Sequence, residues 1–415
     1  MRSVRHSVSR GRLGYAGPVA SALLLVACVM VVTPAFAAYP QTYLFDQKWS
    51  FPSPYPSTSF QPHGMVTYAG HQFVAAYDNY IAEYENGALV RTFPLAGVAT
   101  ASEVAVGENV MWVIDNDTGQ VRKFDASGTY LDVTITGFGI GFNLPYAVSI
   151  DSFGCVYVAD MGGLGYGGRI TKYAADGTYV CTLGSSATAG LWKPVSIAIG
   201  PNQHVYVADG EAGKIREYTP SNAGRTSYSA SVTFSAALEE PDSLSIDAAG
   251  NIFALDGSYQ TLTKYSPDRS VLSKWGQFGT GAGQFTHPWS VTVDPATHQV
   301  YVDDRDAYNL QRFHLQDVRP LTYAYGTVTV KKGSYASFKY KVTGEISPGV
   351  SAKVKIYSGT RLKATISCGS VAQGFWHTKK WKCNLARGTY TWKVYATDSA
   401  GHTQRSVSYK TLKVK

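Results

Sequence analysis

The sequence repeats one pattern six times, and this repeat constrains the fold more than any other feature. An apolar residue, a variable residue, a polar residue and an aromatic residue follow one another at Ile81–Tyr84, Val121–Phe124, Ile170–Tyr173, Ile215–Tyr218, Leu262–Tyr265 and Leu310–Phe313. The closing aromatic residues are 40, 49, 45, 47 and 48 residues apart. Repeats at periods of about 20–50 residues are typical of folds built from one stacked unit. The chain is therefore predicted to contain six copies of a single structural unit.

Two further patterns indicate what this unit is. An aromatic residue, an apolar residue, any residue and Asp precede five of the six copies, and they end at Asp115, Asp160, Asp209, Asp256 and Asp304, whereas the first repeat has Ala76. Alternating small and large residues open the units after Pro62, Ala101, Pro145, Pro194, Pro241 and Pro288. Alternation with period two predicts β-strands. Charged residues make up only 16% of the chain, and 29 Tyr and 41 Gly suit an all-β fold rich in turns. Each unit is predicted to be a four-stranded β-propeller blade.

The best-formed repeats resemble a known family. The segments 283–291, 300–304 and 310–313, and likewise 142–145 with 156–160, resemble the NHL repeat. The resemblance covers residues 60–315 and implies a six-bladed β-propeller with one blade per repeat. The last repeat lacks a fourth strand after Phe313, whereas Tyr43–Trp49 resembles the fourth strand Val271–Trp275. We therefore expect the N-terminal strand to complete the sixth blade and close the ring, which removes exposed sheet edges.

Residues 1–37 are predicted to be a secretory signal peptide. Four Arg residues precede an apolar run from Val19 to Val32, which ends at a small-x-small box, Ala35–Ala37. We expect cleavage after Ala37 and a secreted or cell-surface protein. Two alternatives stay open. Leu25–Cys28 resembles a bacterial lipobox that would leave a lipidated Cys28, and the apolar run could remain uncut as an anchor.

Residues 321–415 break the repeat and are predicted to form a second, basic domain after a propeller domain at 38–320. Seven short alternating strands, the first at Tyr325–Val330, suit a β-sandwich. The segment 388–401 resembles the late hairpin of bacterial Ig-like modules. Cys368 and Cys383 flank a predicted loop, and export favours a disulfide between them. Whether Cys155 and Cys181 pair stays open.

Charge is divided unevenly along the chain. Residues 1–37 carry +4, residues 38–320 carry −11, and residues 321–415 carry +15, with 17 Lys and Arg against Glu345 and Asp398. A charge asymmetry of this size is informative about the partners that the protein binds and not about its fold. We expect the cluster of Lys379, Lys380 and Lys382 to bind an anionic wall polymer or membrane surface. Export argues against nucleic acid as the partner. The alternative is that these lysines only protect an exposed sheet edge.

No motif for catalysis appears in the sequence. Nucleophile elbows, metal-ligand spacings, phosphate loops and dinucleotide fingerprints are missing, and no cofactor is expected. Some NHL-type propellers are peptide-amidating lyases with a zinc ion held by three His, and other six-bladed relatives are lactonases. Only His63 and His287 lie at the start of an inner strand, so the three-His site is not evident. A secreted lyase or lactonase with a metal in the channel is the alternative function.

The strongest candidates for a binding site are the positions that do not repeat. At the start of the inner strands the residues vary, and His63, Glu103, Tyr146, Asp242 and Trp289 are predicted to bind a ligand. Aromatic rings beside carboxylates suit a glycan or a peptide or protein ligand. The alternative is that Tyr146 and Trp289 only plug the channel mouth. The Asp that recurs in each unit is predicted to cap its own turn. The chain is thus predicted to be a secreted binding or adhesion scaffold.

Overall fold

A computed structural model describes residues 43–51, 62–75, 79–139, 141–162, 167–184, 190–234, 238–315, 320–343, 349–398, 403–404 and 407–415 of the 415-residue chain. The described residues form 32 β-strands and no helix. Among them there is accordingly no helix of the length and apolarity needed to cross a membrane. The predicted signal peptide, with its alternatives at Cys28 and as an anchor, lies outside the described residues.

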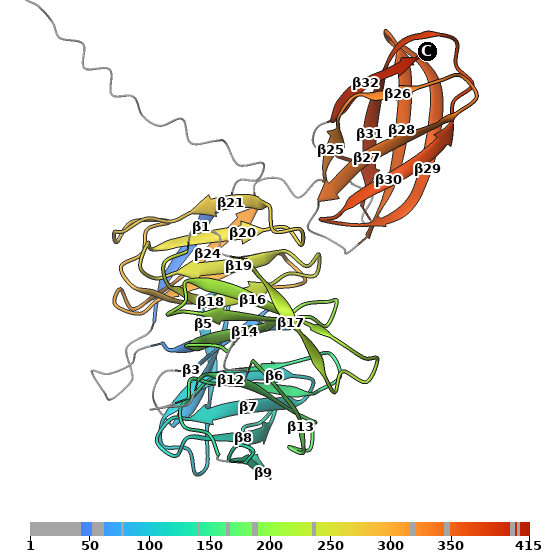
Figure 1. Cartoon of the computed structure of the whole chain (residues 1–415). Coiled ribbons are helices and arrows are strands. Elements are labelled where there is room, and N and C mark those ends of the chain that lie inside the picture. Colours follow the sequence, from blue (N-terminus) through green and yellow to red (C-terminus); the bar gives the residue numbers. More distant parts are fainter. Residues whose placement is uncertain are drawn as a thin grey trace, which may run out of the picture. The chain divides into compact units, whose positions relative to one another are not determined.

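Six four-stranded antiparallel sheets follow one another in chain order between β1 and β24 (Figure 1). Sheet 1 contains β2 (Gly64–Tyr68), β3 (His71–Ala75), β4 (Tyr80–Glu85) and β5 (Ala88–Pro94), and sheet 2 contains β6 (Ala101–Gly107), β7 (Val110–Asp115), β8 (Gln120–Asp125) and β9 (Tyr130–Ile135). Sheet 3 contains β10 (Pro145–Ile150), β11 (Val156–Asp160), β12 (Arg169–Tyr173) and β13 (Tyr179–Leu183), and sheet 4 contains β14 (Pro194–Ile199), β15 (Val205–Asp209), β16 (Lys214–Pro220) and β17 (Tyr228–Phe234). Sheet 5 contains β18 (Pro241–Ile246), β19 (Ile252–Asp256), β20 (Thr261–Tyr265) and β21 (Val271–Trp275), and sheet 6 contains β22 (Pro288–Val293), β23 (Val300–Asp304), β24 (Asn309–Leu315) and β1 (Tyr43–Ser50).

The first strands of the six sheets form a closed ring around a central channel. Each first strand contacts the first strand of the next sheet, and β22 of sheet 6 contacts β2 of sheet 1. Six apolar clusters each combine residues of two neighbouring sheets, and the one between sheets 6 and 1 contains Tyr84, Tyr301 and Leu310. The ring is therefore closed by packing on all six sides.

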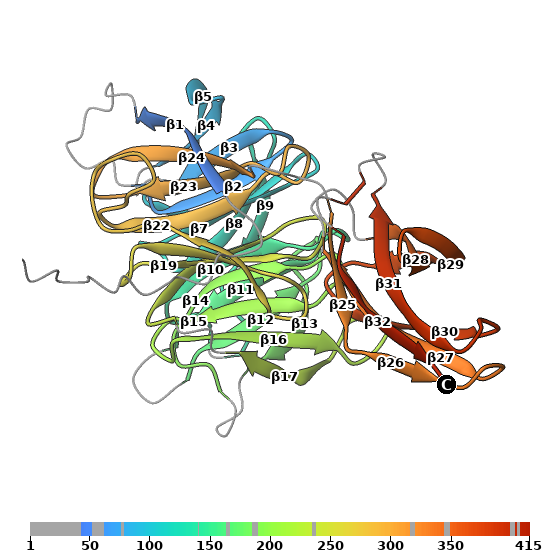
Figure 2. The same ribbon diagram turned by 90° about the horizontal axis from the view of Figure 1, so that it is seen from above.

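The N-terminal strand completes sheet 6, as the sequence predicts. β1 pairs antiparallel with β24, with Tyr43 opposite Leu315 and Trp49 opposite Leu310. Figure 2 shows β1 beside β24 at the outer edge of the sheet. The Tyr43 ring stacks on Trp275 of sheet 5, with centroids 4.4 Å apart. This strand therefore joins the beginning of the described chain to the last repeat.

The recurring aromatic residue of each repeat is a core residue. Tyr84, Phe124, Tyr173, Tyr218, Tyr265 and Phe313 are all buried, and each lies on the third strand of its sheet. Burying a large aromatic side chain contributes roughly 1.5–3 kcal/mol. The motif recurs because each pair of neighbouring sheets needs the same space filled.

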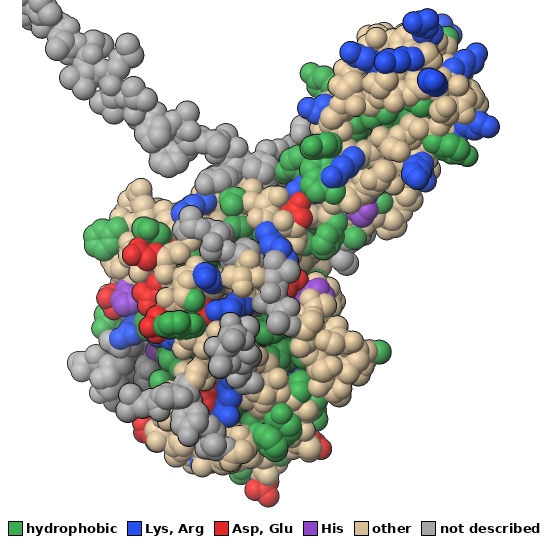
Figure 3. All heavy atoms as spheres, in the orientation of Figure 1, with side chains coloured by type: hydrophobic (Ala, Val, Ile, Leu, Met, Phe, Trp, Pro, Cys, Tyr) green, Lys and Arg blue, Asp and Glu red, His purple; other side chains and the backbone are tan. Residues whose placement is uncertain are grey.

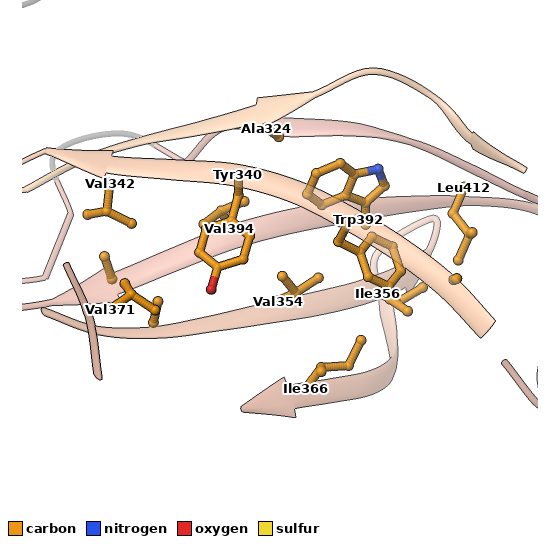
Figure 4. Packing of buried hydrophobic residues seen from close by; sticks show 14 of the residues in the cluster. Ala324, Tyr340, Val342, Val354, Ile356, Ile366, Val371, Trp392, Val394 and Leu412 are labelled. Carbon is orange, nitrogen blue, oxygen red and sulfur yellow. The ribbon is translucent and has the colours of Figure 1, made fainter. Parts of the chain in front are cut away.

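Residues 321–415 form two further sheets. The three-stranded sheet contains β25 (Leu321–Tyr325), β27 (Tyr335–Thr343) and β30 (Trp376–Lys382). The five-stranded sheet contains β26 (Val328–Val330), β32 (Tyr409–Val414), β31 (Gly388–Thr397), β28 (Gly349–Ser358) and β29 (Arg361–Ala372). Both sheets contribute to one apolar core, in which Tyr340 from the smaller sheet lies near Trp392, Val354 and Ile356 from the larger one (Figure 4).

The predicted strand Tyr325–Val330 is wrong in one respect, because it is two strands. Gly326 adopts a φ of 69°, which ends β25 at Tyr325. β25 pairs with β27, whereas β26 pairs parallel with β32 in the other sheet. The chain therefore changes sheet at this glycine, which an alternating pattern alone does not reveal.

The predicted Cys368–Cys383 disulfide is not formed in the structure, where both residues have free thiols. Cys368 lies in β29 of the five-stranded sheet, whereas Cys383 follows β30 of the three-stranded sheet and is buried. The two cysteines thus belong to different sheets instead of flanking one local loop. Cys155 and Cys181 are also free thiols and are half-buried.

Candidate functional site

Five side chains that the sequence singles out surround one small hollow at the end of the channel where the first strands begin. They are His63, Glu103, Tyr146, Asp242 and Trp289, and Val195 with three serines completes the lining. The five come from sheets 1, 2, 3, 5 and 6. The hollow measures about 20 Å³, which is close to the room that a single water molecule needs. Their role in binding stays a prediction, but the fold brings all five together.

Three aromatic rings, which we call the aromatic lid, close this end of the channel. The ring centroid of His63 lies 4.9 Å from that of Trp289 and 5.7 Å from that of Tyr146. The guanidinium of Arg305 lies 4.8 Å from the Trp289 ring centroid, within range of a cation–π interaction. Tyr146 and Trp289 are only half-buried. The aromatic lid therefore fills the channel mouth and still presents ring surface outward.

His63 is the buried member of the aromatic lid and is neutral near pH 7. Its Nδ1 lies 3.0 Å from the backbone oxygen of Ser102. Because a carbonyl oxygen can only accept, Nδ1 is the protonated ring nitrogen. Burial lowers the pKa of His63 to about 4, and the positive charge of Arg305 adds to this effect. His63 thus supplies a fixed, uncharged ring.

Glu103 lies one residue deeper and lines both the hollow and the channel, which has a volume of about 240 Å³. A Cβ atom at Gly64 would lie 2.4 Å from Glu103 Oε1, so only glycine leaves room for this carboxyl group. Burial raises the pKa of Glu103 well above its usual value, and the negative charge of Asp303 raises it further. Glu103 therefore favours its protonated form over a wide pH range.

The other residues at this depth show why Glu103 is exceptional. Each first strand pairs on one edge only, so its other edge leaves backbone groups without ladder partners. The Leu244 N–H donates to Ser196 Oγ at 3.0 Å, and the Val291 N–H donates to Ser243 Oγ at 3.1 Å. These hydroxyl groups therefore link neighbouring first strands, and we call the serines at 196, 243 and 290 the hydroxyl ring.

Gly64 occupies the hydroxyl-ring position in sheet 1 and has no hydroxyl group to offer sheet 2. There the Val104 N–H donates to Glu103 Oε1 instead, at 3.2 Å. Ser290 on the other side donates to the Met65 carbonyl oxygen at 3.4 Å. Sheet 3 has Ala147 at this position, so serine recurs only in sheets 4, 5 and 6, and Gly64 and Glu103 form a matched pair in sheets 1 and 2.

Asp242 shows the same relation to a glycine. A Cβ atom at Gly257 would lie 2.0 Å from Asp242 Oδ2, so Gly257 makes room for this carboxyl group. Burial raises the pKa of Asp242 to about 7, and the nearby Glu240 raises it as well. Asp242 is therefore half ionised near neutral pH, when it can both donate and accept hydrogen bonds.

Asp303 is a buried carboxylic acid that the sequence analysis missed. It accepts the N–H of Ser290 at 2.5 Å, and burial raises its pKa to about 7. The equivalent residue of the other described second strands is apolar, as at Ile114, Ala159 and Leu255. An acid that interrupts an apolar column was the signal available in the sequence.

The recurring Asp does more than cap its own turn. Asp160 accepts the N–H groups of Asn143 and Leu144, at 3.1 and 2.9 Å, in the loop that leads into β10. Asp209, Asp256 and Asp304 hold the loops before β14, β18 and β22 in the same way. Bonds within the turn also occur, as from the Tyr259 N–H to Asp256 at 3.1 Å. These Asp residues therefore fix the loops that carry the variable residues.

The described residues contain no group of three or more His, Cys, Asp or Glu side chains arranged to hold a metal ion. The Nδ1 atoms of His71 and His204 lie 2.7 Å from carboxylate oxygens of Glu83 and Glu217, respectively. His287 lies 3.3 Å from Asp306 at the rim. His71, His204 and His287 thus each lie beside a single carboxylate and do not surround a common metal site.

The predicted lysine cluster is split between two faces. Along β30 the exposed residues alternate, so Lys380 and Lys382 are exposed, whereas Lys379 is half-buried on the other face with Trp381. A β-strand directs successive side chains to opposite faces, so three lysines this close in sequence cannot share one. Figure 3 shows Lys and Arg side chains spread over the surface of the C-terminal sheets.

Comparisons with known proteins support the fold. No protein-family model matches the sequence, and no curated protein matches it either. A gluconolactonase from Xanthomonas campestris has a similar structure, with a TM-score of 0.51 and 15% identity over 68% of this chain and 93% of that one. A chain of a nidogen–laminin complex has a TM-score of 0.47 and 12% identity, covering 61% of this chain and 97% of that one. The likeness to the gluconolactonase structure supports a propeller-like arrangement of the six repeated sheets.

Proposed function

We propose that the chain is a secreted or cell-surface binding protein whose aromatic lid and adjoining carboxyl groups bind a glycan or a peptide segment. The proposal includes a signal peptide at 1–37, a six-bladed NHL-like propeller at 38–320 and an Ig-like β-sandwich at 321–415. The carrying observation is that the varied residues at the start of the first strands, His63, Glu103, Tyr146, Asp242 and Trp289, converge on one hollow. A fold alone needs no such variation at equivalent positions of a ring.

The size of the hollow defines how a ligand would bind. About 20 Å³ cannot admit a sugar ring or a side chain, so the ligand lies across the aromatic lid. Trp289 and Tyr146 offer ring faces, and Asp242 offers a carboxyl group that exchanges between donor and acceptor near pH 7. An extended ligand with hydroxyl or amide groups fits this arrangement.

The test is a glycan and peptide array probed with the protein beginning at Ala38. Ligands found for the wild type should be lost with Trp289→Ala. They should be retained with Phe153→Ala, because Phe153 is an exposed aromatic residue in the turn at the other end of β10 and β11. Equal loss with both variants, or no loss with Trp289→Ala, would refute a site at the aromatic lid.

We further propose that the basic C-terminal sheets dock the protein to an anionic surface. The charge of +15 over residues 321–415 supports this, and the −11 over residues 38–320 disfavours docking through the propeller. Exposed charges are screened over about 8 Å at physiological salt, so binding should weaken steeply as salt rises. Binding that does not respond to salt would contradict electrostatic docking.

A second candidate function is hydrolysis of a lactone or a lyase reaction with a metal in the channel. The observation that favours it is the fold shared with a gluconolactonase, together with the raised pKa of Glu103 in the channel wall. Metal analysis of the purified protein separates the two functions. Stoichiometric zinc or calcium whose removal abolishes lactone hydrolysis would favour the enzyme over the binding protein.

A further inference from the structure

The outward face of the three-stranded C-terminal sheet carries aromatic and lysine side chains in register. Residues directly opposite one another in antiparallel strands point to the same face. Tyr325 is opposite Lys339, Ser337 is opposite Lys380, and Tyr335 is opposite Lys382. Trp376 lies on the same face, opposite Lys341. We call the exposed set Tyr325, Lys339, Trp376, Lys380 and Lys382 the aromatic–lysine face.

Two rings of this face form a corner around an ammonium group. The ring centroids of Tyr325 and Trp376 are 5.6 Å apart and their planes meet at 75°. The Lys339 Nζ lies 5.1 Å from the first centroid and 5.5 Å from the second. Tyr325 and Trp376 remain 60% and 40% exposed. Two exposed rings in contact form a contiguous apolar patch, which indicates an interaction site more strongly than rings exposed singly.

The core does not account for these rings. The alternate residues of β27, Ala336, Phe338 and Tyr340, are buried against the five-stranded sheet and form the inner face. The aromatic–lysine face is therefore the outer face, where polar residues suffice for folding. Its aromatic content calls for a ligand.

The charge around the face indicates the sign of that ligand. Residues 321–415 contain only two acids, of which Asp398 is buried and Glu345 lies outside the described residues. Asp268 accepts a hydrogen bond from the buried Lys341 at 2.8 Å, which leaves the exposed Lys339, Lys380 and Lys382 for a ligand. Alternate residues of a strand are about 7 Å apart, so Lys380 and Lys382 present positive charges at that spacing along β30. Lys339 adds a third positive charge from the neighbouring strand β27, opposite Thr378. Such spacing complements a polymer that carries a negative charge on successive units.

We propose that the aromatic–lysine face binds an acidic polysaccharide. Tyr325 and Trp376 stack against sugar rings, and Lys339, Lys380 and Lys382 pair with carboxylates along the chain. The inference rests on the proposed docking function and names its ligand class. A bilayer would be engaged by protruding apolar side chains, whereas these rings lie along a sheet with Lys339 between them.

The test compares polygalacturonate with highly methyl-esterified pectin, which has the same backbone without most of its charge, and with vesicles containing phosphatidylglycerol. The protein beginning at Ala38 should bind polygalacturonate at low salt and the esterified polymer at least tenfold more weakly. Trp376→Ala and Lys339→Met should each weaken polygalacturonate binding about tenfold or more. The exposed pair Tyr409→Ala and Lys410→Met, on β32 of the other sheet, provides matched controls.

Each contrary result has a defined meaning. Binding to neither polygalacturonate nor vesicles would overturn both this inference and the docking function. Binding to polygalacturonate that survives Trp376→Ala with Lys339→Met would leave docking intact and overturn the aromatic–lysine face. Binding to vesicles alone, lost with the same variants, would assign the face to a membrane instead of a polysaccharide. Melting curves of all variants exclude unfolding as the cause.

Discussion

The hydroxyl ring and the aromatic lid occupy consecutive positions at the start of the first strands, and they follow opposite rules. In the hydroxyl ring serine recurs, and its hydroxyl group links one first strand to the next. In the aromatic lid and beside it the residues differ from sheet to sheet, from His63 to Asp242 to Trp289. Because both layers share one backbone geometry, the repeated residue reflects what the ring needs. The varied residues reflect a requirement from outside the fold.

Glu103 and Gly64 sharpen this comparison because they break the hydroxyl ring together. The carboxyl group takes over the acceptor role of a serine and places a titratable group in the channel wall. A buried carboxyl group costs free energy that a serine would not. We therefore group Gly64 and Glu103 with the varied residues beside the aromatic lid, although they occupy positions where other sheets have serine.

The largest effect should come from deleting residues 39–50, which would remove β1 and open the ring. Sheet 6 would lose its fourth strand, and the stack of Tyr43 on Trp275 would be lost with it. Loss of buried aromatic packing predicts a cost on the order of 5 kcal/mol or more. The hydroxyl ring and the aromatic lid should both lose order in the deletion variant. A deletion variant with an unchanged melting temperature would contradict ring closure through β1.

A smaller effect is expected from Gly64→Ala. The new Cβ would lie 2.4 Å from Glu103 Oε1, while the backbone at 64 tolerates alanine because its φ is not positive. The displaced carboxyl group would lose its bond from the Val104 N–H, at a cost of about 1–3 kcal/mol.

The double variant Gly64→Ala with Glu103→Ala separates this clash from other effects. It should recover about 1–2 kcal/mol relative to the sum of the single changes, measured by urea unfolding. Strictly additive costs would show that the two residues are not a matched pair.

Asp303→Asn should change how the free energy of unfolding depends on pH, with no gain over wild type at acidic pH. Burial raises the pKa of Asp303 to about 7, so the folded protein holds its proton more tightly than the unfolded chain, where the pKa is about 4. Stability from this group is complete below pH 4 and is lost as pH rises to 7. The variant lacks this loss and should gain up to about 4 kcal/mol over wild type between pH 4 and 8.

Titration of His63 changes stability with pH in the opposite direction. The quantity to measure is therefore the free energy of unfolding of Asp303→Asn minus that of the wild type at each pH. Its pKa is lowered to about 4, so its contribution is complete above pH 6.5 and is lost as pH falls toward 4. Both proteins retain His63, so its contribution cancels. A difference that stays constant from pH 4 to 8 would show that Asp303 does not titrate there.

Much of the fold could be predicted because the repeat reports backbone requirements. The recurring aromatic residues fill equivalent spaces between sheets, and the missing last strand pointed to Tyr43–Trp49 as its replacement. The rim residues could be found for the same reason, since they vary where a ring requires nothing. Their use by a ligand is a separate matter that the repeat does not decide.

What could not be predicted depends on pairs that are distant in sequence. Gly64 and Glu103 explain one another only once sheets 1 and 2 lie side by side, and Gly257 meets Asp242 only once β18 pairs with β19. In the C-terminal sheets, Gly326 divides a continuous alternating run, and the strand that follows joins the other sheet. Local alternation shows that a strand forms but not with which neighbour it pairs.

The most direct test of the account measures ligand affinity and unfolding free energy for Trp289→Ala and Ser243→Ala together. Trp289 is half-buried, so its loss should cost about 1–2 kcal/mol of stability and weaken ligand binding at least tenfold. Ser243→Ala should leave the Val291 N–H without its acceptor, costing about 1 kcal/mol with unchanged affinity. If Trp289→Ala instead costs roughly 3–5 kcal/mol and leaves affinity unchanged, the aromatic lid is a plug and the account is wrong.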